Sequence, residues 1–227
     1  MPMPIPSSTL TEIELLIFDL DGTLVDTKMD LALSVNAMRQ QLGLSALPHE
    51  VITTYVGHGV AALIRRSLGE IASDDTLQRG SEIFVEYYRH HLLDNTIPYP
   101  GVPEALEELR DRKMSVLTNK PADMSRKILA ELGLASYFGV IYGGDSFPQR
   151  KPEPIGVWKL MEDLQVPAAK TMMVGDSDTD VLTGRNAKVW TCAVTYGFGA
   201  ASLKDTPPDL LLEDLRELPP LLGSQTS

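Results

Sequence analysis

The chain has 227 residues, 43% of them hydrophobic, and its formal net charge of −11 argues against nucleic acid and anionic membrane surfaces as partners. An anionic substrate would therefore need positive charge supplied locally. One cysteine, Cys192, excludes an internal disulfide, and no apolar run reaches the roughly 18 residues of a membrane span. The opening segment lacks the basic start and apolar middle of a signal peptide, so we expect a cytoplasmic, globular protein.

The first predicted element is a buried strand over residues 14–18, ELLIF. About 70 residues, roughly 28 to 97, then pass without a convincing strand, while apolar residues recur at helical spacing, as at Leu31, Val35 and Met38. A structureless loop of that length is improbable in a compact protein. We therefore predict a helical insertion that forms a cap above the carboxyl ends of the strands.

The rest of the chain alternates between apolar runs and amphipathic segments of helix length. Strands are predicted at 114–118, 139–143, 171–175 and 190–194, and helices at 101–112, 121–133 and 153–165. The strand runs are continuously apolar, which is typical of a parallel sheet covered on both faces. The alternation predicts an α/β fold with a doubly wound parallel sheet. Residues 1–27 and 98–227 would form this core, and residues 28–97 the cap domain.

Polar side chains follow four of these segments, in DLDG, LTNKP, RKPEP and VGDSDTD. They belong to Asp19, Asp21, Thr118, Asn119, Lys151, Asp176 and Asp180. Because parallel strands end at one edge of a sheet, we expect them to converge there. Each has an ordinary structural alternative: the aspartates as turn formers, Thr118 or Asn119 as a helix cap, and Lys151 as a surface residue. Ser177 and Asp178 both resemble N-caps of the helix that follows the last motif, and Asp178 is expected to be one.

The acidic residues of this edge predict a bound cation. Two ionised carboxylates about 4 Å apart repel by about 4 kcal/mol at an effective dielectric constant of about 20, and Asp176 adds to this repulsion. A hard divalent ion would relieve the repulsion, and Mg²⁺ takes few carboxylates, keeps waters and accepts a phosphate oxygen. An EF-hand calcium loop is excluded, because counting from Asp176 places Val181 and Ala187 where glycine and glutamate are required.

This arrangement is suited to phosphoryl transfer. A carboxylate beside Mg²⁺ can attack phosphorus and form an aspartyl phosphate. Its neighbour two residues on lies on the same side of an extended chain, where it can protonate the leaving oxygen and later take a proton from water. Lys151, the Thr118 hydroxyl and N–H groups at a helix start would hold the phosphoryl oxygens.

The motifs DLDGTLVDT, LTNK, RKPEP and VGDSDTD, in this order, resemble those of the haloacid dehalogenase-like hydrolases, specifically the phosphoglycolate phosphatase group. The resemblance implies a Mg²⁺-dependent phosphatase with a Rossmann-like core and a helical cap inserted after the first motif. Its substrate would be a small-molecule phosphate ester, with 2-phosphoglycolate as the leading candidate.

The resemblance also implies roles for individual residues. Asp19 would be the nucleophile and Asp21 the general acid and base, with Asp19, Asp176 and the Asp21 backbone carbonyl on the metal and Asp180 in support. Thr118 and Lys151 would bind phosphate, and Asn119 and Lys120 would support the phosphate loop. The cap segment VGHGVAALIRRSLG would place Gly57, His58 and Gly59 on a loop facing the active site, with Arg65 or Arg66 contacting a substrate carboxylate. Lys188 departs from the family, which commonly has a glycine there that would suit a helix C-cap.

Alternative functions within and outside the family would each require particular residues. A true dehalogenase would lack Asp21, and a phosphonate hydrolase needs a cap lysine, whereas residues 28–97 contain only Lys28. A sugar phosphomutase, and pyrophosphate or a nucleoside monophosphate as substrate, stay open. A phospho-aspartate signalling module would have a different order of acidic residues and no inserted cap, and it would release about one phosphate per chain.

Overall fold

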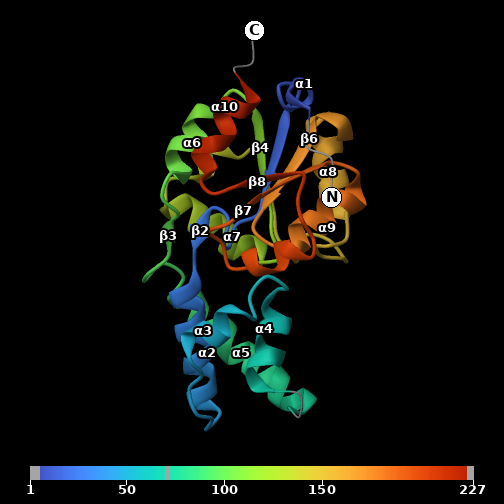
Figure 1. The fold of residues 1–227 in the computed structure, drawn as a ribbon. Coiled ribbons are helices and arrows are strands. Elements are labelled where there is room, and N and C mark those ends of the chain that lie inside the picture. Colours follow the sequence, from blue (N-terminus) through green and yellow to red (C-terminus); the bar gives the residue numbers. More distant parts are fainter. Residues whose placement is uncertain (1–5, 70–71, 224–227) are drawn as a thin grey trace. The chain divides into compact units, whose positions relative to one another are not determined.

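The computed structural model describes residues 6–69 and 72–223, and the chain divides into two compact units, shown together in Figure 1. The first unit consists of residues 1–25 and 98–227, and the second of residues 26–97. The sequence-based boundaries were 1–27 and 28–97. At the two crossings, β2 (Val25–Asp26) and β3 (Ile97–Pro98) pair with each other in a two-stranded sheet.

The first unit is built on a six-stranded sheet in the order β5-β4-β1-β6-β7-β8, in which every pair is parallel. Its strands are β1 (Leu15–Phe18), β4 (Lys113–Leu117), β5 (Val140–Tyr142), β6 (Thr171–Gly175), β7 (Trp190–Val194) and β8 (Leu210–Leu212). The chain adds β4 and β5 on one side of β1 and then β6, β7 and β8 on the other. This order confirms the predicted doubly wound parallel sheet, and only β8 among its strands was not predicted.

Helices lie on both sides of this sheet, with α6 and α10 on one side and α8 and α9 on the other in Figure 1. The helices are α1 (Ser7–Leu10), α6 (Val102–Glu108), α7 (Ala122–Glu131), α8 (Ile155–Leu164), α9 (Asp178–Ala187) and α10 (Leu218–Leu222). Short 3₁₀ segments occupy Ala135–Tyr137, Ala168–Lys170, Ala200–Lys204 and Leu215–Glu217. The predicted helices at 101–112, 121–133 and 153–165 therefore correspond to α6, α7 and α8.

The packing of α8 shows how the apolar pattern builds the core. Val157 and Leu160, three residues apart on one face of the helix, are fully buried against Leu15 and Ile17 of β1 and Met173 of β6. Alternate residues of β1 face this helix, and those between them face the opposite layer. The central strand is therefore fixed from both sides, together with the residues that follow it.

The helix after the last motif differs in its ends from the sequence-based expectation. Of the two candidate caps, Ser177 is the N-cap of α9, whereas Asp178 is the first helical residue. At the other end, Lys188 is the C-cap with φ +61°, the left-handed conformation that glycine adopts more readily. Lys188 thus forms the turn at the end of α9 in the conformation that a glycine would adopt.

The second unit is helical between its two crossing strands. Its helices are α2 (Lys28–Gln41), α3 (His49–Thr53), α4 (Val60–Leu68) and α5 (Asp74–His90). Leu31, Val35 and Met38 are buried on one face of α2, and α2 packs against α5. At the start of α5, Ser73 accepts a hydrogen bond from the Thr76 N–H at 3.2 Å, and Asp74 adds favourable negative charge. The role of this unit as a cap over the active site stays a prediction.

One buried carboxylate joins the two ends of the second unit. Asp30, in the first turn of α2, accepts hydrogen bonds from the backbone N–H and side-chain amide of Asn95 at 3.0 and 2.8 Å. It also accepts them from the backbone N–H and hydroxyl of Thr96 at 2.8 and 2.7 Å. Asp30 follows β2 and Thr96 precedes β3, so this cluster fastens the outgoing segment to the returning one.

We expect Asp30→Ala to lower the free energy of unfolding by about 3 kcal/mol, because it leaves the buried Thr96 donors without an acceptor. Urea denaturation followed by circular dichroism measures the change. Asp94→Ala is the control, since that carboxylate is exposed beside His91, and its removal should change stability little. Equal stability of the two variants would contradict a fastening role for Asp30.

Candidate active site

The candidate site begins where the chain leaves three neighbouring strands of the sheet. Phe18, the last residue of β1, pairs with Val116 of β4 on one side and Val174 of β6 on the other. Asp19 therefore follows the central strand, and its N–H donates to the Val174 carbonyl at 2.9 Å. Thr118 follows β4 and Asp176 follows β6, so all three residues lie at the edge of the sheet that the carboxyl ends of the parallel strands form. This edge is the point where the strand order reverses, which is where open α/β sheets bind ligands.

Three carboxylates cluster at this edge around one lysine. Asp19, Asp176 and Asp180 are buried, and one ligand atom from each lies within 4.8 Å of the others. The buried Nζ of Lys151 lies 2.9 Å from Asp19 Oδ1 and 2.6 Å from Asp180 Oδ1. One ammonium faces three carboxyl groups, so the cluster has an excess of negative charge.

Burial and mutual repulsion shift the proton affinities of this cluster. Burial raises the pKa of Asp19 to about 6, although Lys151 counteracts it, and Asp180 raises it further. Burial raises the pKa of Asp176 to about 8, with additional repulsion from Asp180 and Asp19. Burial alone would lower the pKa of Lys151, but Asp180 and Asp19 outweigh it and raise that pKa. The two carboxyl groups with raised pKa hold protons that they would release in the unfolded chain. Their contribution to the free energy of unfolding therefore declines as the pH rises from the ordinary pKa of an aspartate, 3.8, to about 6 for Asp19 and about 8 for Asp176.

Asp176 is oriented by two loops. The Thr23 hydroxyl lies 3.3 Å from Asp176 Oδ1, and the Gly199 N–H donates to Oδ2 at 2.9 Å. Gly22 has φ +91°, and a Cβ at this position would lie 2.5 Å from Asp176 Oδ2. A Cβ at Gly197 would come equally close, at 2.4 Å. The glycine of DLDG and the glycine-containing segment after β7 thus leave the space that Asp176 occupies.

Asp180 connects the last motif to Lys151. Its Oδ2 accepts hydrogen bonds from the N–H groups of Asp176 and Ser177 at 3.2 Å each and from the Ser177 hydroxyl at 2.8 Å. Its other oxygen accepts from Lys151 Nζ at 2.6 Å. Asp180 therefore shapes the turn that carries Asp176 and holds the lysine in place.

The second motif is tied to the third through Asn119. The Asn119 amide donates to the Lys151 carbonyl at 3.1 Å and accepts from the Lys151 N–H at 3.0 Å. Thr118 is buried, and its hydroxyl oxygen accepts the Lys120 N–H at 3.2 Å. Thr118, Asn119 and Lys151 line one small cavity together with Gly143 and Gly144. The residues predicted to hold phosphate are therefore brought together.

The donor set of this edge fits a divalent cation. Asp19 Oδ1 is buried and, despite its ion pair with Lys151, accepts no hydrogen bond of acceptable geometry. An unsatisfied carboxylate oxygen next to Asp176 and Asp180 is suited to a hard cation. Asp21 directs its carboxylate elsewhere, to Lys120 Nζ at 2.8 and 3.0 Å. Its carboxylate is thus separate from the acidic cluster.

Comparison with known proteins identifies the family of this chain. The haloacid dehalogenase-like hydrolase model matches residues 16–194, which include all the predicted motifs. The chain belongs to this family. A phosphoglycolate phosphatase from Vibrio parahaemolyticus is 39% identical over 221 residues, covering 92% of this chain and 96% of that protein. One from Aquifex aeolicus is 35% identical over 215 residues, with coverage of 92% and 96%.

Solved structures agree with this membership of the haloacid dehalogenase-like hydrolases. The crystal structure of a predicted phosphoglycolate phosphatase from Haemophilus somnus matches with a TM-score of 0.89 and 28% identity, covering 93% of this chain and 99% of that one. That of a putative phosphoglycolate phosphatase from Lactobacillus delbrueckii has a TM-score of 0.87 and 27% identity, with coverage of 93% and 99%. The fold thus extends over both units.

The predicted substrate-binding residues of this hydrolase's second unit precede and follow the start of α4. Gly57 and Gly59 have φ +108° and +84°, and Gly59 is the N-cap of the helix. His58, Arg65 and Arg66 are exposed. Their contact with substrate stays a prediction.

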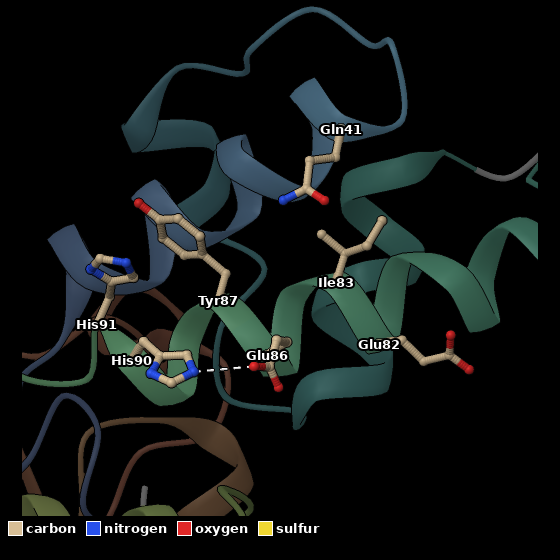
Figure 2. Close-up of a pocket in the computed structure, with 7 residues that line it drawn as sticks. All are labelled: Gln41, Glu82, Ile83, Glu86, Tyr87, His90 and His91. Carbon is tan, nitrogen blue, oxygen red and sulfur yellow. Dashed lines mark hydrogen bonds and ion pairs between the residues drawn. The ribbon is translucent and has the colours of Figure 1, made fainter.

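A cleft of about 470 Å³ lies in the second unit along α5 (Figure 2). In its lining, the rings of Tyr87 and His91 stack with centroids 4.1 Å apart. His90 lies 3.1 Å from Glu86, the pair joined by the dashed line in Figure 2. Among the described residues, the acidic cluster of the first unit is the group of three potential metal ligands. The chemistry is accordingly expected there and not in this cleft.

Sequence reasoning did not single out Thr23 or the segment 195–199, which orient Asp176. The available signal was the glycine-containing TYGFG directly after a predicted strand at the same sheet edge.

No helix among the described residues is long and apolar enough to cross a membrane.

Proposed function

We propose that this haloacid dehalogenase-like hydrolase is a Mg²⁺-dependent phosphatase that acts on a small phosphomonoester through an aspartyl phosphate. The observation that carries the proposal is the position of Asp19, which follows the central strand, pairs with Lys151 and belongs to the acidic cluster. Phosphoglycolate is the first candidate substrate, because it appears in the names of the relatives. A cytoplasmic location is part of the proposal and suits the free, buried Cys192.

Asp19, Asp176 and the Asp21 backbone carbonyl would hold Mg²⁺, which when bound would offset negative charge on the phosphoryl oxygens. An Asp19 carboxylate oxygen attacks phosphorus, and the bond between phosphorus and the leaving oxygen breaks. Asp21 gives its proton to that oxygen. The Lys151 ammonium and the Thr118 hydroxyl hold the phosphoryl oxygens during the transfer.

The second half of the reaction frees the enzyme. Asp21, now a carboxylate, takes a proton from a water molecule as the water oxygen attacks phosphorus. The bond between phosphorus and the Asp19 oxygen breaks, and inorganic phosphate leaves. Return of the phosphoryl group to an organic acceptor instead of water would make the enzyme a phosphomutase.

A panel of phosphate compounds tests the proposal. With Mg²⁺ present, we expect repeated turnover and the highest kcat/KM for phosphoglycolate, compared with pyrophosphate, nucleoside monophosphates and hexose phosphates. Chelation with EDTA should abolish the activity, and added Mg²⁺ should restore it. Release of only about one phosphate per chain would instead indicate a signalling module, and a phosphorylated sugar product a mutase. A higher kcat/KM for another ester would overturn the substrate while keeping the reaction.

A further inference from the structure

A second buried lysine lies at the same sheet edge and pairs with a different carboxylate. Lys120 Nζ donates to both oxygens of Asp21, at 2.8 and 3.0 Å. The side chains are only 4% and 12% exposed, so this ion pair is largely removed from water. Lys151 meanwhile pairs with Asp19 and Asp180. Each of the two lysines thus holds its own part of the acidic site.

We propose that Lys120 is a positioning residue that fixes the direction of the Asp21 carboxyl group, which gives a proton in the first step and, as a carboxylate, takes one in the second. This inference rests on the proposed function, in which Asp21 serves first the leaving oxygen and then water. A carboxylate held through both oxygens has little freedom to rotate. Without Lys120, the Asp21 carboxyl group would lose this two-point restraint on its direction relative to the path of the transferred proton.

Both members of the pair are anchored through their backbones, as positioning requires. The Lys120 N–H donates to the Thr118 hydroxyl oxygen at 3.2 Å, and the Lys120 carbonyl accepts the Gly144 N–H at 2.8 Å. Asp21 forms a bridge with Val25, just before the second unit begins. The two residues come third after β4 and β1, which are neighbours in the sheet. The distance between their side chains is therefore set by the sheet.

Burying an ion pair has a desolvation cost that its attraction offsets only when the geometry is good. Two apolar residues would fill the same space at similar or better stability, so the pair is better explained by the orientation that it gives Asp21. A direct contact between Lys120 and the phosphoryl group is the rival role. The two roles differ in a measurable way, because a positioning residue acts only while Asp21 is present.

A double-mutant cycle with the full-length, Mg²⁺-loaded enzyme separates them. On the best substrate of the panel, we expect Lys120→Met to lower kcat roughly 10-fold to 100-fold with KM changed less than about twofold, the size of effect that misplacement of a reacting group produces. Asp21→Asn should lower kcat by about 10²-fold to 10⁴-fold. Adding Lys120→Met to Asp21→Asn should then lower kcat no further.

Lys120→Arg is the second variant, since it keeps the charge and a two-point contact with Asp21. It should retain more of kcat than Lys120→Met, and should also have no effect in the Asp21→Asn background. If Lys120→Met does not fold, Lys120→Arg is measured alone in the two backgrounds: a loss of kcat with Asp21 present and none with Asp21→Asn supports the inference, and any other result overturns it. A further loss in the Asp21→Asn background, a parallel rise in KM, or an unchanged kcat in both lysine variants would overturn the inference.

Failure of the proposed function has a different signature. In that case the wild-type enzyme would show no turnover, or the Asp19→Asn variant would keep the wild-type turnover. Either result would also remove the basis for the role of Lys120. If the wild type turns over, Asp19→Asn is inactive and the lysine variants match the wild type, only the role of Lys120 is wrong.

Discussion

Asp19→Asn is expected to remove phosphatase turnover while leaving the protein folded and no less stable. The amide cannot attack phosphorus, so kcat should fall by about 10⁴-fold or more, in line with the loss of a nucleophile in other enzymes. Stability should be kept or should rise, because burial and neighbouring carboxylates raise the pKa of Asp19 and a neutral side chain relieves this repulsion.

Turnover of an aryl phosphate and thermal unfolding of the same preparation measure the two effects. Asp178→Asn is the matched control, because Asp178 lies in the same motif but its carboxylate accepts a hydrogen bond from the adjacent Thr179 N–H, at 2.8 Å, and belongs to no part of the acidic cluster. We expect that variant to keep its turnover. Asp19→Asn with a tenth or more of wild-type kcat would exclude Asp19 as the nucleophile.

Lys151→Met is expected to damage both stability and activity. The buried ammonium lies between Asp19 and Asp180, and its removal would leave two carboxylates without their cation. Breaking a buried pair in this way costs about 3–5 kcal/mol of unfolding free energy. Loss of a donor to the phosphoryl oxygens should lower kcat by about 10²-fold to 10³-fold.

Urea denaturation and steady-state kinetics measure these losses. Lys159→Met is the control, since Lys159 forms exposed pairs on α8 with Glu162 and Asp163 and should change neither quantity much. Adding Asp180→Asn to Lys151→Met should restore part of the stability, because it removes one unpaired charge, but should not restore kcat. Wild-type stability in Lys151→Met would show that the buried lysine does not balance these carboxylates.

The sheet was predictable because most residues of its strands are apolar and do not alternate with polar ones. Five predicted strands agree with β1, β4, β5, β6 and β7 to within about two residues, since a strand buried on both faces has few polar residues. The predicted helix 153–165 begins two residues later, at Ile155, after Pro154. β8 was missed because it has only three residues and follows Pro207 and Pro208. β2 and β3, with two residues each, are too short to show a period.

The convergence of the acidic residues could be inferred from their positions after parallel strands, whereas their individual partners could not. Lys120 and Lys151 both follow predicted motifs, and which aspartate each contacts depends on side-chain directions that spacing does not specify. The backbone N–H of Gly199 was beyond sequence reasoning for another reason. Every residue except proline carries such a donor, so only the folded backbone shows which one faces Asp176.

The fastening of Asp30 to Asn95 and Thr96 affects how such a protein can evolve. Together with the pairing of β2 and β3, it means that residues 26–97 leave and re-enter the rest of the chain at adjacent points. A segment attached in this way can lengthen, shorten or be exchanged between descendants without altering the register of the sheet. Such changes would leave Asp19, Lys151 and Asp176, which all belong to the other unit, in their places at the ends of the strands.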